Sequence, residues 1–287
     1  MKKVLKGLLA VLAFTTIFAA AEVKASDGIG LTVGVDYWSS YISKGMYSYG
    51  DQQGWFFPYA SFELISGLSV GVCGELNSAW VGSKSEEPEY NGAQKDYNAF
   101  GGGLDYEYSA EGLFTASVGL WYYRTKNNFW SYGTAYAGFD LDMAPFVTPF
   151  VMVTAEHYTG DNTTEKGFKE SYKEYSGNSN RTDIYLQAGL KKSVEIAKDV
   201  AGLDFGAVVG YLRLRSFGAN INDISDIDFF VNSSVTYGLV TFTGGFHYVI
   251  VPSKELKYDA PVKEDSPYGG EKDIHRFYAT FGASVSI

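Results

Sequence analysis

The side chains best suited to acid–base chemistry are three histidines, His157, His247 and His275. A hydrolase of the Ser-His-acid kind needs a serine hydroxyl beside an imidazole that a third group holds in place. By the alternation described below, His247 shares a face with Ser234 and Asn232 of the preceding segment, a set of the kind that a membrane phospholipase uses. Serine and asparagine are common on any water-facing strand surface, and the other two histidines have no obvious partner. A lipid hydrolase is therefore the least favoured of three hypotheses.

Carboxylates are the most frequent charged groups on the same face. Their positions predict an acidic lining: Asp36, Glu63, Glu75, Asp105, Glu107, Asp140, Glu156 and Asp228. The cations opposing them are chiefly Lys191 and Arg276. If this face lined a water-filled bore, it would concentrate cations and give the bore a cation preference. The alternative is that pairs near segment ends, such as Asp105 with Glu107, lie only at a wet rim.

Aromatic side chains also fall on this face. The expected inward rings are those of Trp38, Tyr59, Trp121, Tyr123 and Tyr185. Such rings could form a stacking surface for sugars or other planar solutes, or they could simply fill the bore of a small barrel. The sequence leaves both readings open.

Composition excludes several other kinds of chemistry. A single cysteine, Cys73, rules out a disulfide framework and a cysteine-based zinc site, and three histidines leave little for a histidine-rich metal centre. The net charge of −10 argues against a nucleic-acid partner. No calcium-loop motif occurs. We therefore expect no cofactor, no metal and no nucleic acid.

The elements that must position these side chains are β-strands. Apolar and polar residues alternate with a period of two again and again, most clearly from Phe277 to Ile287, and almost no helical period occurs. About twelve segments show this alternation: 29–41, 53–65, 68–80, 96–109, 113–125, 130–143, 147–159, 181–194, 203–215, 226–238, 240–251 and 274–287. Their length of about 10 to 14 residues suits tilted strands that cross a bilayer and exceeds that of ordinary soluble strands.

The connections favour a closed barrel over a sandwich. Links such as Ser66–Gly67 and Ala110–Gly112 are tight turns, although 195–202 is longer. The alternate links are mostly long and polar: 42–52, 81–95, 160–180, 216–225 and 252–273. Short turns at one edge and long loops at the other are typical of an outer-membrane barrel. The predicted fold is all-β, a single closed antiparallel transmembrane barrel of about twelve strands, with short periplasmic turns and long extracellular loops.

Residues 1–25 predict a cleaved secretory signal peptide. Three lysines precede an uncharged run, Gly7–Ala21, and small residues offer cleavage after Ala21 or Ala25. The segment carries four lysines and one glutamate, so its removal takes the net charge from −10 to −13. The mean hydropathy of −0.10 and the lack of another long apolar run exclude a helical membrane protein. We expect residues 26–287 to form the barrel in the outer membrane.

The start of the predicted barrel resembles a known family. Residues 35–46 read Val-Asp-Tyr-Trp-Ser-Ser-Tyr-Ile-Ser-Lys-Gly-Met, and Pro58 precedes a second hairpin that includes 67–74. This opening resembles that of TorF-type porins, whose first strand carries Asp-Tyr followed by a basic residue and glycine. Lys44 stands where that group usually has arginine, and the chain ends in Ile287 where such barrels most often end in phenylalanine. The resemblance implies a passive channel of unassigned substrate.

The function predicted from the sequence is passive diffusion of small hydrophilic solutes, with cations preferred. Expected partners are outer-membrane lipid and lipopolysaccharide, the barrel-assembly machinery and the solutes themselves. The main alternative is a structural or adhesive surface barrel with a closed lumen, whose working parts are the loops 81–95, 160–180 and 252–273. Oligomerisation is left open.

Overall fold

The computed structural model describes most of the chain after the expected signal peptide. The described residues are 30–44, 46–47, 54–77, 98–125, 131–144, 146–159, 182–215, 221–253, 256 and 275–287. Residues 1–25 and most of the long connections, among them 81–95 and 160–180, lie outside them. The signal peptide and the adhesive-loop hypothesis therefore stay predictions.

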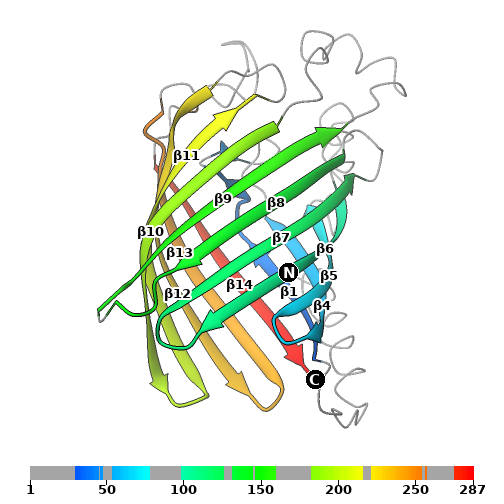
Figure 1. The fold of residues 1–287 in the computed structure, drawn as a ribbon, viewed down its shortest axis with the longest axis vertical. Helices are drawn as coiled ribbons and strands as arrows, with labels where there is room; N and C mark the ends of the chain where they lie inside the picture. Colours follow the sequence, from blue (N-terminus) through cyan, green and yellow to red (C-terminus); the bar gives the residue numbers. More distant parts are fainter. Residues whose placement is uncertain are drawn as a thin grey trace, which may run out of the picture.

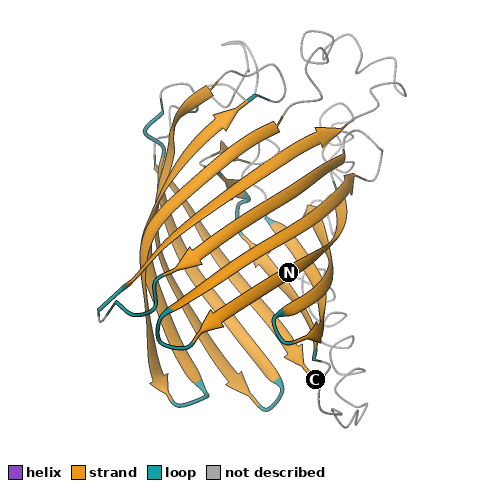
Figure 2. Cartoon of the chain, viewed as in Figure 1, coloured by secondary structure: helices purple, strands orange, loops and turns teal. Residues whose placement is uncertain are grey.

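The described residues form fourteen strands. Their bounds are β1 Leu31–Trp38, β2 Ile42–Ser43, β3 Met46–Tyr47, β4 Trp55–Ile65, β5 Leu68–Asn77, β6 Ala99–Ala110, β7 Phe114–Thr125, β8 Ser131–Asp140, β9 Thr148–Thr159, β10 Thr182–Ala197, β11 Ala201–Leu214, β12 Ile221–Tyr237, β13 Val240–Ile250 and β14 His275–Ser286. Twelve of them form one closed barrel in the order β1-β14-β13-β12-β11-β10-β9-β8-β7-β6-β5-β4, and β2 pairs only with β3 (Figures 1 and 2).

The barrel is antiparallel throughout, and the first strand closes it against the last. β1 pairs with β14 from Thr32↔Ser286 to Trp38↔Thr280, and on its other edge with β4 from Leu31↔Phe62 to Trp38↔Trp55. Closure leaves no strand edge unpaired, as a sheet surrounded by lipid requires. The twelve-stranded closed barrel that the alternation predicted is confirmed.

One end of the barrel carries the short links, at the bottom of Figure 1, and is called the turn end; the opposite end is the loop end. The β4–β5 turn shows why glycine is needed here. Gly67 has φ +81°, and a Cβ at this residue would lie 2.1 Å from the carbonyl oxygen of Glu107 on the adjacent strand. Gly112, in the β6–β7 turn, has φ +70° but open space around it.

Some predicted boundaries were wrong. β1 ends at Trp38 instead of residue 41, and residues 42–47, predicted as loop, contain the β2–β3 hairpin. β10 runs on to Ala197 and β11 begins at Ala201, so the link predicted as 195–202 is a tight turn. β12 begins at Ile221, inside the predicted loop 216–225. The sequence did not show this start, because a β-bulge opposite Gly210 and Tyr211 adds one residue to β12 and breaks the alternation of apolar and polar residues.

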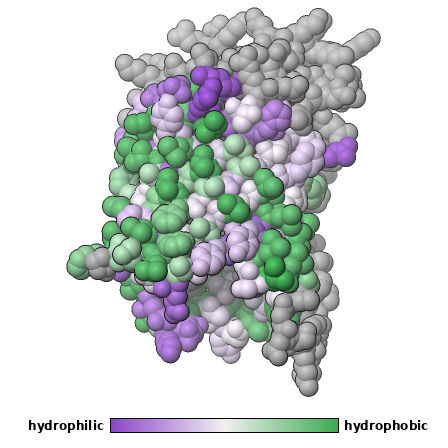
Figure 3. Space-filling view, viewed as in Figure 1, coloured by the Kyte–Doolittle hydropathy of each residue, from purple (hydrophilic) through white to green (hydrophobic). Residues whose placement is uncertain are grey.

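The outer surface of the wall is apolar. Leu120, Phe246 and Phe277 expose 63%, 66% and 63% of their area, and apolar side chains gather over the middle of the wall in Figure 3, with hydrophilic ones toward both ends. A water-soluble protein rarely exposes so large a contiguous apolar surface, whereas a barrel in lipid requires it. Among the described residues no helix is long and apolar enough to cross a membrane.

Candidate functional site: the interior of the barrel

Every acidic residue expected to line the bore lies on the interior face of its strand. Contacts within the barrel place Glu75, Asp105, Asp140, Glu156 and Asp228 there. A Cβ at Gly282 of β14 would meet the Asp36 carboxylate, and Glu63 and Glu107 line a cavity at the turn end. These eight carboxylates therefore lie on the side of the wall opposite its apolar outer surface.

The expected inward aromatics also lie inside. Trp38 stacks on Tyr278 with ring centroids 5.5 Å apart. Trp121 stacks on Tyr123, which in turn stacks on Tyr132 at 4.7 Å and an interplanar angle of 9°. These stacked rings line the interior face of the wall.

Tyr59 and Tyr185 occupy space that only glycine leaves on the adjacent strand. A Cβ at Gly34 would lie 2.6 Å from the Tyr59 ring, and one at Gly210 would lie 2.5 Å from the Tyr185 hydroxyl. The Tyr185 hydroxyl donates to the Asp226 carboxylate at 2.8 Å. Small residues on one strand thus make room for large rings on the next.

Three of the eight carboxylates have basic partners. Lys44 pairs with Glu156, Lys191 with Asp140, and His247 with Asp228 at 3.0 Å between Nδ1 and Oδ2. Four others have no basic partner among the described residues. These are Asp36, partway along β1, and Glu63, Asp105 and Glu107, toward the turn end.

The turn end of the bore holds a polar cavity of about 340 Å³. It is lined by Glu63, Asp105 and Glu107 together with hydroxyl-bearing side chains such as Ser117 and Tyr136. Asp105 is held in place by two donors, the Trp121 indole at 2.8 Å and the Tyr136 hydroxyl at 2.6 Å. The result is a cavity lined by carboxylates, in which two hydrogen bonds orient the Asp105 side chain.

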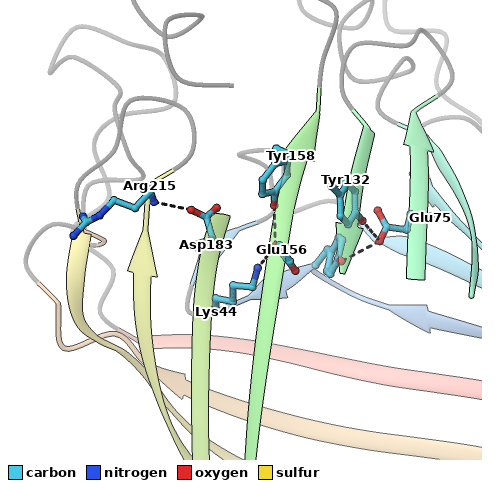
Figure 4. Close-up of polar contacts among 8 residues, drawn as sticks. Lys44, Glu75, Tyr132, Glu156, Tyr158, Asp183 and Arg215 are labelled. Atoms are coloured by element: carbon cyan, nitrogen blue, oxygen red, sulfur yellow. Dashed lines mark hydrogen bonds and ion pairs between the residues drawn. The ribbon is translucent and has the colours of Figure 1, made fainter. Parts of the chain in front are cut away.

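The loop end is organised differently, because chain leaves the wall and enters the bore. After β1, Ser39 still pairs with Ala279 of β14, but Tyr41, Ile42 and Lys44 turn inward. The hydroxyls of Tyr41 and Tyr132 both donate to Glu75, at 3.3 and 2.9 Å, and Lys44 reaches Glu156, which also accepts from Tyr158 at 2.8 Å (Figure 4). Glu75 and Glu156 therefore hold protein groups and are not simply exposed to the bore.

An apolar cluster fills the same end on the β10–β14 side. It comprises Ile42, Tyr185, Leu212, Leu214, Ile221, Val249, Val251, Leu256 and Tyr278, with Trp38 packed against it. Ile42 comes from the segment after β1, and Leu256 from the segment after β13. Apolar side chains therefore occupy part of the bore at the loop end.

Sequence reasoning missed several of these residues. Lys44 was noted only as part of the family resemblance, and Asp183 and Asp226 were not named at all. Asp183 accepts from the Arg215 backbone N–H at 2.6 Å (Figure 4), and Asp226 accepts from Tyr185 and Ser225. The only signal for Lys44 was a lone cation in an otherwise uncharged stretch between Asp36 and Asp51.

The Ser234–His247–Asn232 set, which the least favoured hypothesis would need for a hydrolase, is not assembled. In the β12–β13 ladder His247 pairs with Phe230, whereas Ser234 pairs with Thr243, four residues away and thus roughly 13 Å along the strands. A nucleophile and its base must lie within about 3 Å. His247 instead stacks on Tyr278 at 4.3 Å and pairs with Asp228. Among the described residues no group of histidine, cysteine and acidic side chains could hold a metal.

Comparisons with known proteins bear on the fold. No family model and no curated protein matches the sequence. The NanC porin has a similar structure, with a TM-score of 0.50, 10% identity and coverage of 89% of this chain and 98% of that one. The KdgM porin has a TM-score of 0.48 and 8% identity, with coverage of 89% of this chain and 99% of that one. An outer-membrane channel from Pseudomonas putida F1 has a TM-score of 0.46 and 10% identity, with coverage of 93% of this chain and 98% of that one.

These three structures are two porins and an outer-membrane channel. At such low identity the likeness to the NanC porin shows the fold alone, a closed barrel of the outer-membrane porin kind. None of the three is described as TorF-type, and that resemblance stays a prediction.

Proposed function

We propose that this protein is an outer-membrane channel for passive diffusion of small hydrophilic solutes, with a preference for cations. The observation that carries the proposal is the contrast between the two faces of one closed wall. The outer face is apolar, and the inner face carries carboxylates that no described basic group neutralises, at a polar cavity of about 340 Å³. Water in such a bore would hold cations as counter-ions.

Location and partners follow from the same contrast. The apolar band suits outer-membrane lipid and lipopolysaccharide, and a barrel of this kind would be inserted by the barrel-assembly machinery after loss of residues 1–25. The solute is proposed only as a class, small and hydrophilic.

The test is single-channel conductance of the refolded chain without residues 1–25 in a planar bilayer under a salt gradient. Stable steps with a cation-selective reversal potential are expected. Conductance steps without cation preference would support the proposed channel and contradict its proposed preference for cations. A folded barrel that never conducts would contradict the proposal.

A second candidate is the closed surface barrel, and one observation favours it. The loop end is occupied by the chain segment after β1 and by the apolar cluster, both of which obstruct the bore. The same conductance measurement separates the two candidates, since a surface barrel with a closed lumen passes no current.

A further inference from the structure

The segment after β1, residues Ser39–Lys44, is here called the crossing segment. It begins directly after β1, and its last residue, Lys44, pairs with Glu156 on β9. In the closed order of twelve strands, β9 is the sixth strand from β1 in either direction, so the two lie on opposite sides of the bore. A segment that leaves one and pairs with the other must traverse the interior.

The side chains of the crossing segment contact both intervening walls. Tyr41 points one way, where it packs edge-on against Phe57 at 5.0 Å and donates to Glu75 of β5. Ile42 points the other way into the apolar cluster of β10–β14 and is 6% exposed. Successive side chains of extended chain point in opposite directions, and here the two directions are opposite walls of the bore.

The length of the segment matches the span. Twelve strands about 4.8 Å apart and tilted by about 40° close into a barrel roughly 24 Å across. The six residues after Trp38, up to Lys44, reach at most about 20 Å, and the extended side chains of Lys44 and Glu156 cover the remainder. Lys44 has φ 54°, a left-handed conformation that places it at the tip of the β2–β3 hairpin.

The far anchor is well enclosed. The side chains of Lys44 and Glu156 are only 10% and 14% exposed, and Tyr158 donates to the same carboxylate oxygen. Figure 4 shows Lys44 directed at Glu156 from the interior side of β9. Removing one partner of an ion pair this shielded from water leaves a buried charge, which costs more than breaking a surface pair.

We infer that the crossing segment is the constriction of the channel, and that the Lys44–Glu156 pair is the anchor that sets the size limit for solutes. This inference rests on the proposed channel function. The segment divides the loop end of the bore, so a solute must pass beside it. Lys44 also places the one cation of the segment at this narrow point, ahead of the acidic cavity at the turn end.

The first experiment compares two lysines. Lys44→Gln and Lys191→Gln each remove one positive charge from the bore, but Lys191 pairs with Asp140 within the wall and holds no crossing segment. The size limit is measured by adding polyethylene glycols of increasing mass and recording which of them lower the single-channel conductance. Lys44→Gln is expected to admit polymers that the unmodified chain excludes and to show noisier open steps, while Lys191→Gln keeps the original limit. Equal limits for the two variants would overturn the inference.

The second experiment does not depend on conduction. In a Cys73→Ser background, Lys44→Cys combined with Glu156→Cys is treated with a short bifunctional thiol reagent, and cross-linking is read from gel mobility. The control combines Lys44→Cys with Asp140→Cys, which lies six residues farther toward the turn end in the β8–β9 register, roughly 20 Å away.

Rapid cross-linking of the first pair alone is expected. Failure of that pair to react in a folded barrel would overturn the crossing geometry. A barrel that cross-links as expected but never conducts would instead contradict the proposed function, so the two failures are distinguishable. In a conducting barrel, the cross-linked form should keep the original size limit.

Discussion

Asp105 is a carboxylate that two hydrogen-bond donors hold in place on the wall of the bore. Trp121 and Tyr136 both donate to one of its oxygens, and no described cation neutralises it. Asp105→Asn keeps an oxygen acceptor for both donors and removes only the charge. The reversal potential under a salt gradient should therefore move toward zero, and further still in combination with Glu107→Gln.

The matched control for Asp105 is Glu111→Gln. Glu111 lies in the exposed β6–β7 turn, where salt screens its charge from the bore. It should leave the reversal potential unchanged. If both variants shifted the reversal potential equally, the net charge of the protein and not the wall of the bore would set the selectivity.

His247 tests the hydrolase hypothesis directly. Since Ser234 lies four residues away in the ladder and the imidazole is engaged by Asp228 and Tyr278, His247 does not activate Ser234 in this geometry. Phospholipid vesicles carrying the refolded protein should release no more fatty acid than empty vesicles, as followed by titration at constant pH. Release that His247→Ala abolishes would reinstate the enzyme.

At this scale the sequence predicted which face of a strand a side chain would occupy, but not what the side chain would touch. The inward positions of Asp36 and Trp121 follow from a period of two, which a wall with one dry and one wet face imposes. The partner of Glu156 does not, because Lys44 comes from a segment outside the alternation. Asp226 lies two residues before Asp228 on the same face, but the alternation does not show that Tyr185 and Ser225 donate to it.

At the scale of elements, the glycines of two tight turns show how local sequence determines the fold. Gly67→Ala must place a methyl group 2.1 Å from the Glu107 carbonyl, whereas Gly112→Ala meets nothing within 4 Å. The second change carries only the left-handed backbone cost of about 1–2 kcal/mol, and the first adds displacement of the neighbouring strand. Urea unfolding of the refolded barrel should show a clearly larger loss for Gly67→Ala, and equal losses would contradict the close approach of this turn to β6.

The crossing segment could not be predicted in the same way, for a physical reason. In a wall strand, alternate side chains meet lipid and water, so their polarity alternates. Tyr41 and Ile42 meet two interior walls, and both are amphipathic or apolar, so no period appears. The segment reads as an ordinary loop until the opposite strand, which is more than a hundred residues later in the chain, is placed beside it.

At the scale of the whole molecule, the two faces of the wall should respond oppositely to the same charge. Leu120 lies midway along β7 with 63% of its area exposed outward, and Ser117 lies on the inner face of the same strand beside the polar cavity. Leu120→Arg puts a guanidinium into hydrocarbon at a cost of about 2–4 kcal/mol near the midplane. Ser117→Arg puts it into water next to Glu107, its register neighbour.

After refolding into lipid vesicles, Leu120→Arg should therefore lower the free energy of unfolding by about 2–4 kcal/mol, and Ser117→Arg should change it little. The measurement is urea titration of the lipid-bound barrel. In detergent micelles, which adapt around a charge, the gap between the two variants should shrink. A barrel that tolerated arginine equally on both faces would not be surrounded by lipid, and the channel, the constriction and the outer-membrane location would lose their common basis.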